Sequence, residues 1–299
     1  MQLNTEEILN IKSFRSWKLS KTQKKNLDEK GFCLIKPTQH LKKWVKKDLS
    51  GIRKIIEKLI TKEGLSAGSE GKEEFTIKKN KKIESGARRV GNLLNKDTIF
   101  AKIATIPILV DAAHYVISSE IKLSSILFRE PEKKAKEQEI HIDWHARRKK
   151  SDKYESVVGF FYLDDSTKKN GATIIIPGSH KKFGYPCEHI NPNKKNRNEI
   201  ILEAPAGSLL ILNANTWHKG GSNLSGEKRG MIAIEYRQRN LKQLLNLKKY
   251  IDLNKKNKFS AYEKYLFGLR NEDSNQIENS YGPGKKFKKW LKLNKQYSY

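Results

Sequence analysis

The clearest strand pattern in the chain is Gly207-Ser-Leu-Leu-Ile-Leu-Asn213, which is followed by Asn215-Thr-Trp-His218-Lys-Gly-Gly-Ser-Asn223. The first segment is a compact apolar run after a glycine, which is the pattern of a buried β-strand. The second segment carries a histidine and then two glycines, which favour a tight turn. We therefore expect His218 to lie where a buried strand meets a turn, at the rim of a β core.

Short runs of the same kind surround this strand from about residue 121 onward. Turn residues such as Asn170-Gly171 and Pro177-Gly178 separate them. Strands at this spacing predict an antiparallel sandwich or barrel rather than alternating βαβ units. The predicted strands span residues 121–128, 139–143, 156–163, 172–176, 208–212 and 229–236.

One domain over residues 1–299 is the simplest organisation, because no repeat or long low-complexity linker divides the chain. Residues 1–120 are expected to be mostly helical and to contain a first strand. Residues 121–240 would form the β core. Residues 241–299 would form a helical or loose, lysine-rich tail.

Within the first part, a glycine followed by an apolar run predicts the first strand over residues 31–36. Apolar residues at three- and four-residue spacing predict helices over 41–62 and 99–120. Residues 63–98 hold several glycines among many charges. This composition predicts an irregular excursion between the two helices.

Two histidines and one carboxylate stand out as candidate metal ligands. His141 and Asp143 lie two residues apart, so that both would face the same side of a strand and could converge on one ion. By itself this pair is equally typical of a histidine beside a surface aspartate. His218 follows 77 residues later and would complete a set of two imidazoles and one carboxylate. Such a facial set leaves coordination positions open and is found in non-haem Fe(II) oxygenases, although other divalent metals accept it too.

Arg229 opens the last apolar strand, eleven residues after His218. A guanidinium is costly to bury unless it meets an anion. Beside an open metal site it would suit the distal carboxylate of a dicarboxylic co-substrate, held in a bidentate salt bridge. The combination of these four residues is more specific than any part of it.

At these residues the chain resembles the phytanoyl-CoA dioxygenase family of Fe(II)/2-oxoglutarate-dependent oxygenases. The resemblance extends over roughly residues 31–236 and is dense from His141 onward. The matching segments are His141-Ile-Asp143, Phe161-Tyr-Leu-Asp-Asp165, Asn170-Gly-Ala-Thr-Ile-Ile-Ile-Pro-Gly-Ser-His180, Ala206-Gly-Ser-Leu-Leu-Ile-Leu212, Thr216-Trp-His218, Asn223 and Arg229.

The resemblance implies a mainly β fold with flanking helices, built on a double-stranded β-helix of the jelly-roll or cupin type. It assigns the iron to His141, Asp143 and His218, which form the catalytic centre, and the C5 carboxylate of 2-oxoglutarate to Arg229. Phe160 falls where the family places an aromatic residue against that co-substrate. The implied reaction uses Fe(II), 2-oxoglutarate and O2 to hydroxylate an unactivated C–H bond of a small molecule, and it releases succinate and CO2.

Residues just after Asp143 are candidates for substrate contacts. Trp144 directly follows this carboxylate and is either a core residue or part of the substrate pocket. Arg147-Arg148-Lys149-Lys150 is either an exposed basic loop or, together with Arg88 and Arg89, the receiver of an anionic substrate. A phosphonate, a phosphate ester or a carboxylate would fit the second interpretation.

The net charge is strongly positive, since 61 Lys and Arg against 33 Asp and Glu give +28. A basic chain attracts phosphate backbones, so the alternative is a nucleic-acid-associated protein that uses the same barrel on a nucleic-acid substrate or for binding only. A dedicated phosphate binder would use more arginine, whereas here lysine predominates and is scattered in twos and threes. We therefore interpret most of the charge as a solvated surface. The complete ligand set argues against a barrel kept only as a structural module.

Two further observations bear on the class of protein. No apolar stretch approaches the roughly 20 residues that span a bilayer, and no secretory signal is visible at the N-terminus. Two cysteines, Cys33 and Cys187, are too few for a disulfide framework or a cysteine-rich zinc site. The expectation is a soluble, cytoplasmic enzyme that acts on a small molecule.

Overall fold

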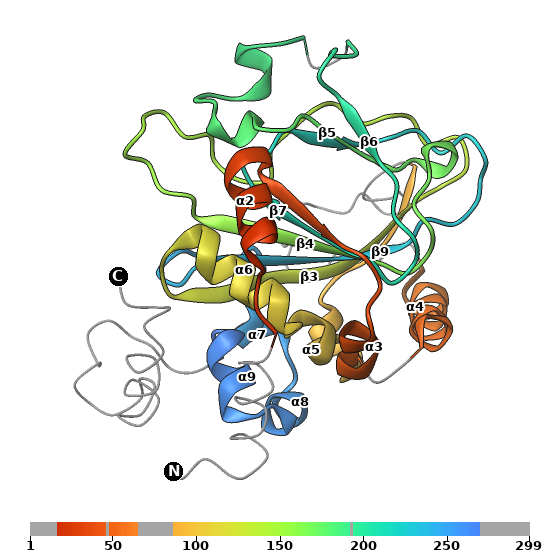
Figure 1. Cartoon of the computed structure of the whole chain (residues 1–299). Coiled ribbons are helices and arrows are strands. Elements are labelled where there is room, and N and C mark those ends of the chain that lie inside the picture. Colours follow the sequence, from red (N-terminus) through yellow and green to blue (C-terminus); the bar gives the residue numbers. More distant parts are fainter. Residues whose placement is uncertain (1–16, 46–47, 65–85, 192–193, 270–299) are drawn as a thin grey trace.

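Two antiparallel sheets face each other in the computed structural model, which describes residues 17–45, 48–64, 86–191 and 194–269 (Figure 1). The larger sheet has the strand order β1-β7-β4-β9-β3-β2, and the smaller one has the order β6-β5-β8. The larger sheet consists of β1 (Phe32–Ile35), β2 (Ala87–Val90), β3 (Ile121–Pro131), β4 (Ser156–Tyr162), β7 (Leu209–Asn213) and β9 (Met231–Gln238). The smaller sheet consists of β5 (Thr173–Ile175), β6 (Ile200–Leu202) and β8 (His218–Gly220).

The predicted strands were found with one exception, and the structure adds three. The strand predicted over 139–143 is wrong, because only His141 makes a bridge there, to His218. Strands β6 and β8 are three residues long, too short to show a period in the sequence. Strand β2 lies inside the irregular segment predicted over 63–98, so the prediction of irregular structure is wrong for the last part of that segment. Residues 65–85 of the segment lie outside the described residues.

Each long helix predicted in the first part is two shorter helices. Instead of one helix over 41–62, the structure has α3 (Gln39–Val45) and α4 (Leu49–Glu63), and Asp48 caps the start of α4. Instead of one over 99–120 it has α5 (Ile99–Ala104) and α6 (Pro107–Ile117). Proline lacks the N–H that a helix interior needs, so Pro107 begins a new helix. The remaining helices are α2 (Lys21–Lys30), α7 (Leu247–Tyr250), α8 (Leu253–Lys258) and α9 (Ala261–Leu266).

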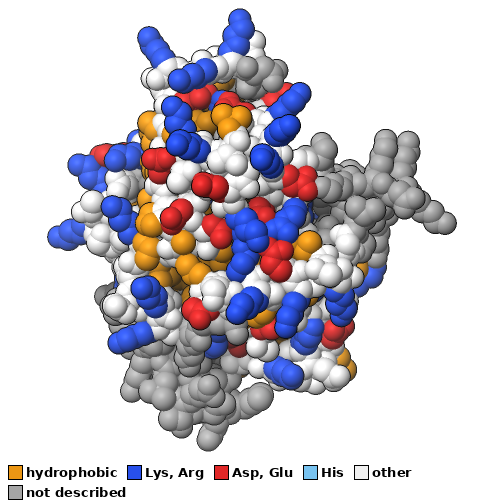
Figure 2. Space-filling view, turned by 90° about the vertical axis from the view of Figure 1, so that its right-hand side faces the viewer, with side chains coloured by type: hydrophobic (Ala, Val, Ile, Leu, Met, Phe, Trp, Pro, Cys, Tyr) orange, Lys and Arg blue, Asp and Glu red, His pale blue; other side chains and the backbone are white. Residues whose placement is uncertain are grey.

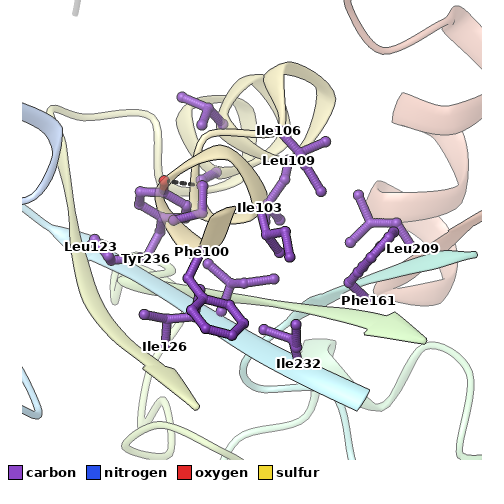
Figure 3. Close-up of a cluster of buried hydrophobic side chains, with 14 of the residues drawn as sticks. Phe100, Ile103, Ile106, Leu109, Leu123, Ile126, Phe161, Leu209, Ile232 and Tyr236 are labelled. Carbon is purple, nitrogen blue, oxygen red and sulfur yellow. Dashed lines mark hydrogen bonds between the residues drawn. The ribbon is translucent and has the colours of Figure 1, made fainter. Parts of the chain in front are cut away.

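The helices cover the outer face of the larger sheet, on the side opposite the smaller sheet (Figure 1). Phe100 and Ile103 of α5 and Leu109 of α6 point into a cluster with sheet residues such as Ile126 and Ile232 (Figure 3). Burying a side chain of this size contributes roughly 1.5–3 kcal/mol. This face of the sheet therefore holds the main core of the protein.

Glycine allows α6 to approach the sheet closely. A Cβ added to Gly159 of β4 would lie only 2.7 Å from Cδ1 of Leu109. On the neighbouring strand, the hydroxyl of Tyr236 donates a hydrogen bond to the carbonyl of Ala104, 2.5 Å away (Figure 3). The Gly159–Leu109 approach and the Tyr236–Ala104 hydrogen bond both pack the helices closely against the larger sheet.

A second, smaller apolar cluster lies between the two sheets, and it includes Phe160 of β4, Ile175 of β5 and Met231 of β9. Successive residues of a strand face opposite sides. On β9, Ile232 and Ile234 accordingly join the helix-side core, whereas Met231 faces the space between the sheets. Among the described residues, no helix is both long and apolar enough to cross a membrane.

Candidate active site

The three predicted ligands come together between the sheets, although 77 residues separate the first from the last. His218 begins β8, and the main chain of His141 pairs with it through two N–H···O hydrogen bonds of 3.0 Å. The N–H of Asp143 donates to the carbonyl of Ala214 at 2.9 Å. These main-chain bonds place the residues 139–143 beside β8, so that one ligand atom from each of His141, Asp143 and His218 lies within 4.8 Å of the others.

Main-chain carbonyls orient both imidazoles. Nδ1 of His141 lies 2.8 Å from the carbonyl oxygen of Glu139, and Nδ1 of His218 lies 2.9 Å from that of Thr216. A carbonyl can only accept, so each Nδ1 carries the proton and each Nε2 presents its lone pair. The Nε2 atoms face the Asp143 carboxylate, at 3.8 Å from Oδ1 for His141 and 3.3 Å from Oδ2 for His218. This is the tautomer and orientation that a metal ligand requires.

The charges at the triad favour a cation between its members. Burial by itself would raise the pKa of the Asp143 carboxyl, but the charge and hydrogen bond of His218 outweigh it, and the pKa is lowered. Burial would lower the pKa of His218, whereas Asp143 raises it above the usual value. An ionised carboxylate thus attracts positive charge to this point, and a divalent ion held by nitrogen and oxygen would supply that charge.

A cavity of about 260 Å³ opens beside the triad, between the two sheets. His141, Asp143 and His218 form part of its wall. Phe160 lines it from β4, with its ring centroid 6.0 Å from that of His218. Leu127, Val158 and Met231 give the wall an apolar portion. The cavity is large enough for a small organic acid beside the triad.

Arg229 lines the same cavity and is almost completely buried, with 1% of its surface exposed. Burial lowers the pKa of its guanidinium to about 10. Its Nε has no hydrogen-bond partner among the described residues, and Nη1 has only the sulfur of Met231, at 3.7 Å. Burying a guanidinium with so few hydrogen bonds costs free energy, and a carboxylate bound to Arg229 would offset that cost.

The surroundings of Arg229 leave room for such a carboxylate. A Cβ added to Gly220 would lie 3.6 Å from Nη2 of Arg229 and 2.8 Å from Oε1 of Gln138, so any side chain here would narrow the space beside the guanidinium. Thr173 also lines the cavity, and its hydroxyl lies 3.0 Å from that of Tyr162. The residues present therefore fit 2-oxoglutarate, with one carboxylate at Arg229 and the other end at the triad.

Trp144, Arg147 and Arg148 do not line this cavity, whereas Arg89, which the sequence analysis considered together with them, does. The indole N–H of Trp144 donates to Glu155 at 2.9 Å, and the guanidinium of Arg237 stacks on its ring at 4.3 Å. Arg147 donates to the carbonyls of Asp152 and Lys150 and to the hydroxyl of Tyr154. Arg148 is exposed and pairs with Glu188 at 2.8 Å. Trp144, Arg147 and Arg148 therefore make their contacts with other protein groups, and their contact with substrate stays a prediction.

Other charged residues line the cavity that the sequence analysis did not single out as site residues. They are Arg129 of β3, Glu235 and Arg237 of β9, and Lys219 of β8, and they join Arg89 of β2. Glu235 accepts hydrogen bonds from Arg237 at 2.6 Å and from the hydroxyl of Ser156 at 3.1 Å. Counting every second residue along the strand from Arg229 would have identified Glu235 and Arg237, because alternate residues share a face.

On the face of the molecule shown in Figure 2, Lys and Arg side chains are interspersed with acidic and apolar ones rather than gathered in one basic patch. Several of the basic groups form ion pairs. Arg88, for example, binds the Glu57 carboxylate at 2.8 Å, and the Nζ of Lys228 lies 3.0 Å from the same carboxylate. Among the described residues, the basic side chains visible on this face thus lie in mixed-charge surroundings.

Comparison with known proteins points to one family. The phytanoyl-CoA dioxygenase (PhyH) family model matches residues 27–231. A protein of Mycobacterium tuberculosis is 33% identical over 91 residues, which are 30% of this chain and 32% of that one. The probable alpha-ketoglutarate-dependent hypophosphite dioxygenase of Stutzerimonas stutzeri is 27% identical over 160 residues, 48% of this chain and 54% of that one. The chain thus spans between a third and about half of the length of these curated relatives.

Solved structures confirm the fold. HygX from Streptomyces hygroscopicus, crystallised with nickel and 2-oxoglutarate bound, matches with a TM-score of 0.57 at 17% identity, over 76% of this chain and 90% of that one. The non-heme alpha ketoglutarate dependent carbocyclase SnoK from nogalamycin biosynthesis matches with a TM-score of 0.56 at 15% identity, over 78% and 89%. The predicted jelly-roll core with flanking helices is therefore confirmed. Because the family model covers more than half of the chain, the chain belongs to the phytanoyl-CoA dioxygenase family.

Proposed function

We propose that the chain is an Fe(II)- and 2-oxoglutarate-dependent dioxygenase that hydroxylates an unactivated C–H bond of a small, anionic molecule and releases succinate and CO2. The observation that carries the proposal is the convergence of His141, Asp143, His218 and Arg229 on one cavity.

Each residue of the set has a distinct role. His141 and His218 would hold the iron through Nε2, and Asp143 would hold it through its carboxylate. Arg229 would bind the C5 carboxylate of 2-oxoglutarate, and Phe160 would pack against the co-substrate. When bound, the iron and 2-oxoglutarate supply the oxidation by O2 that a protein side chain cannot perform.

The protein would orient the reactants and exclude water from them. Leu127, Val158 and Met231 form apolar wall beside the charged groups, and a dry wall strengthens the interactions of those groups with a bound anion. Five basic side chains line the cavity against two acidic ones, Asp143 and Glu235. This excess of positive charge supports an anionic substrate.

A cytoplasmic location belongs to the same proposal. Cys33 is buried and Cys187 is exposed, and both are free thiols. An exposed thiol persists most readily in a reducing compartment. The PhyH family and its named relatives further support a small-molecule substrate.

Two measurements test the proposed function. The first is calorimetric binding of 2-oxoglutarate to the protein loaded with Mn(II), and the second is succinate formation with Fe(II), ascorbate and a set of candidate substrates. We expect His141→Ala and His218→Ala to abolish both signals. His145→Ala is the matched control, because this exposed histidine lies four residues from His141 and does not line the cavity. Wild-type succinate formation by His141→Ala would contradict the proposal.

A further inference from the structure

Arg229 is oriented by its main chain more than by partners of its guanidinium. Among the described residues, its Nε has no hydrogen-bond partner and its Nη1 has only the sulfur of Met231, at 3.7 Å. A side chain with so few partners points where the backbone angles of its own residue direct it. The groups that hold the main chain around residue 229 therefore decide whether the guanidinium faces the cavity.

Side chains hold the peptide groups on both sides of Arg229. On one side, Nδ2 of Asn170 donates a hydrogen bond to the carbonyl of Lys228 at 3.3 Å. On the other side, the carboxylate of Asp164 accepts the N–H of Gly230 at 2.7 Å. A hydrogen bond to a carboxylate is shorter and stronger than one between neutral groups. The direction of the Arg229 side chain thus depends most on Asp164.

Arg53 of α4 holds the Asp164 carboxylate in this position. Its Nη2 forms ion pairs with both Asp164 and Glu130, and only 12% of the Arg53 side chain is exposed. A Cβ added to Gly230 would lie 2.6 Å from Nη1 of Arg53, so the guanidinium packs directly against this stretch of main chain. Burial raises the pKa of Asp164, and the N–H of Gly230 and the charge of Arg53 partly offset the rise. Arg53 thus favours the ionised form of the carboxylate that holds Gly230.

We propose that Asp164 and Arg53 are positioning residues for the co-substrate, which fix the main chain at Gly230 and thereby aim the Arg229 guanidinium into the cavity. The inference rests on the proposed function, and it assigns residues that act on the co-substrate from outside the cavity, since neither lines it. A guanidinium that is fixed before the ligand arrives loses little conformational freedom when it binds a carboxylate. Without Asp164, that freedom would be lost on binding, and the affinity for 2-oxoglutarate would fall.

The test is calorimetric titration of the Mn(II)-loaded protein with 2-oxoglutarate. We expect Asp164→Asn and Arg53→Gln each to weaken binding about tenfold, which corresponds to roughly 1.4 kcal/mol. Arg53→Lys keeps the charge but not the planar fork that bridges two carboxylates, and we expect it to restore part of the affinity lost in Arg53→Gln. Equal affinity in wild type, Asp164→Asn and Arg53→Gln would overturn the inference.

Asp165→Asn is the matched control. This neighbouring carboxylate also accepts a main-chain N–H, that of Ala206 at 2.7 Å, but in a segment other than that of Arg229. The control removes the same charge and should bind 2-oxoglutarate as the wild type does, and melting temperatures are compared for both variants. Equal weakening in Asp164→Asn and Asp165→Asn would overturn the inference, because a general loss of stability would then explain both.

A double-mutant cycle shows whether the effect is exerted through Arg229. In the Arg229→Met background, Asp164→Asn should change the affinity for 2-oxoglutarate by less than about twofold, because the guanidinium that it positions is gone. The same loss of affinity in both backgrounds would contradict a positioning role.

Amide hydrogen exchange gives a readout that needs no ligand. The N–H of Gly230 should exchange at least about tenfold faster in Asp164→Asn and Arg53→Gln than in the wild type, whereas that of Ala206 should keep its rate. An unchanged rate at Gly230 would overturn the inference. A wild-type protein that does not bind 2-oxoglutarate would instead refute the proposed function and, with it, the role of Arg229 on which the inference rests.

Discussion

The two faces of the larger sheet contain alternate residues of the same strands but bury different chemistry. On β9, Ile232, Ile234 and Tyr236 face the helices, whereas Met231, Ala233, Glu235 and Arg237 face the cavity. The helix side is a continuous apolar core. The cavity side holds charged groups that are costly to bury without partners or ligands. We therefore expect the helix-side face to supply stability and the cavity-side face to bind ligands, so that substitutions on each face should separate the two properties.

The largest effect is expected on the helix side. Phe100 is completely buried between α5 and the sheet. Phe100→Ala should lower the free energy of unfolding by about 3–5 kcal/mol, because it removes apolar burial and leaves a cavity. Denaturant titration measures the loss. At a temperature where the variant is folded, its affinity for 2-oxoglutarate should equal that of the wild type, and a changed affinity would break the separation of the two faces.

The complementary change on the cavity side is Arg229→Met. It should weaken 2-oxoglutarate binding about 100-fold, which is roughly 2.7 kcal/mol, because a buried charge-assisted pair is lost. The melting temperature of the ligand-free protein should not fall, since the substitution removes a buried cation whose Nε has no hydrogen-bond partner among the described residues. A marked loss of stability without ligand would show that Arg229 belongs to the scaffold.

A buried histidine away from the cavity gives an intermediate, pH-dependent effect. His180 is 2% exposed, and burial lowers its pKa to about 4. Below a pH of about 6.5 the unfolded chain binds a proton that the folded protein refuses, so stability falls as the pH decreases towards 4. This group contributes about 1.4 kcal/mol per pH unit to the slope. His180→Gln should flatten the stability profile in this window by that amount, and an unchanged slope would contradict the assignment.

The smallest effect is expected for the basic loop after Asp143. Arg148→Gln removes an exposed pair with Glu188, and solvent screens such pairs so that they contribute little to stability. The KM for the substrate should stay within about twofold of the wild-type value, and the melting temperature should hardly change. A large rise in KM would support the prediction that this loop receives an anionic substrate.

Much of the fold and the centre of the site could be predicted from local pattern. The apolar runs that became β3, β4, β7 and β9 are long enough to show a strand pattern. The two long helices were predicted undivided because the apolar periodicity persists across both breaks, although Pro107 and Asp48 are local signals for the start of a new helix. The segment 139–143 was predicted as a strand from its short β-like run, but only His141 forms a bridge there, to the three-residue strand β8.

The sequence by itself determined the family, the jelly-roll core and the candidate set of His141, Asp143, His218 and Arg229, because ordered motifs of a few residues carry them. The three-dimensional fold was needed to show that Arg89 lies opposite Arg129, that Glu235 lines the cavity with Arg237, that Arg147 is held by its own loop, and that Arg148 pairs with Glu188. The physical reason is that strand register and burial arise from contacts between distant residues. A one-residue shift of register would turn Arg89 out of the cavity and Arg88 into it without changing a single local motif.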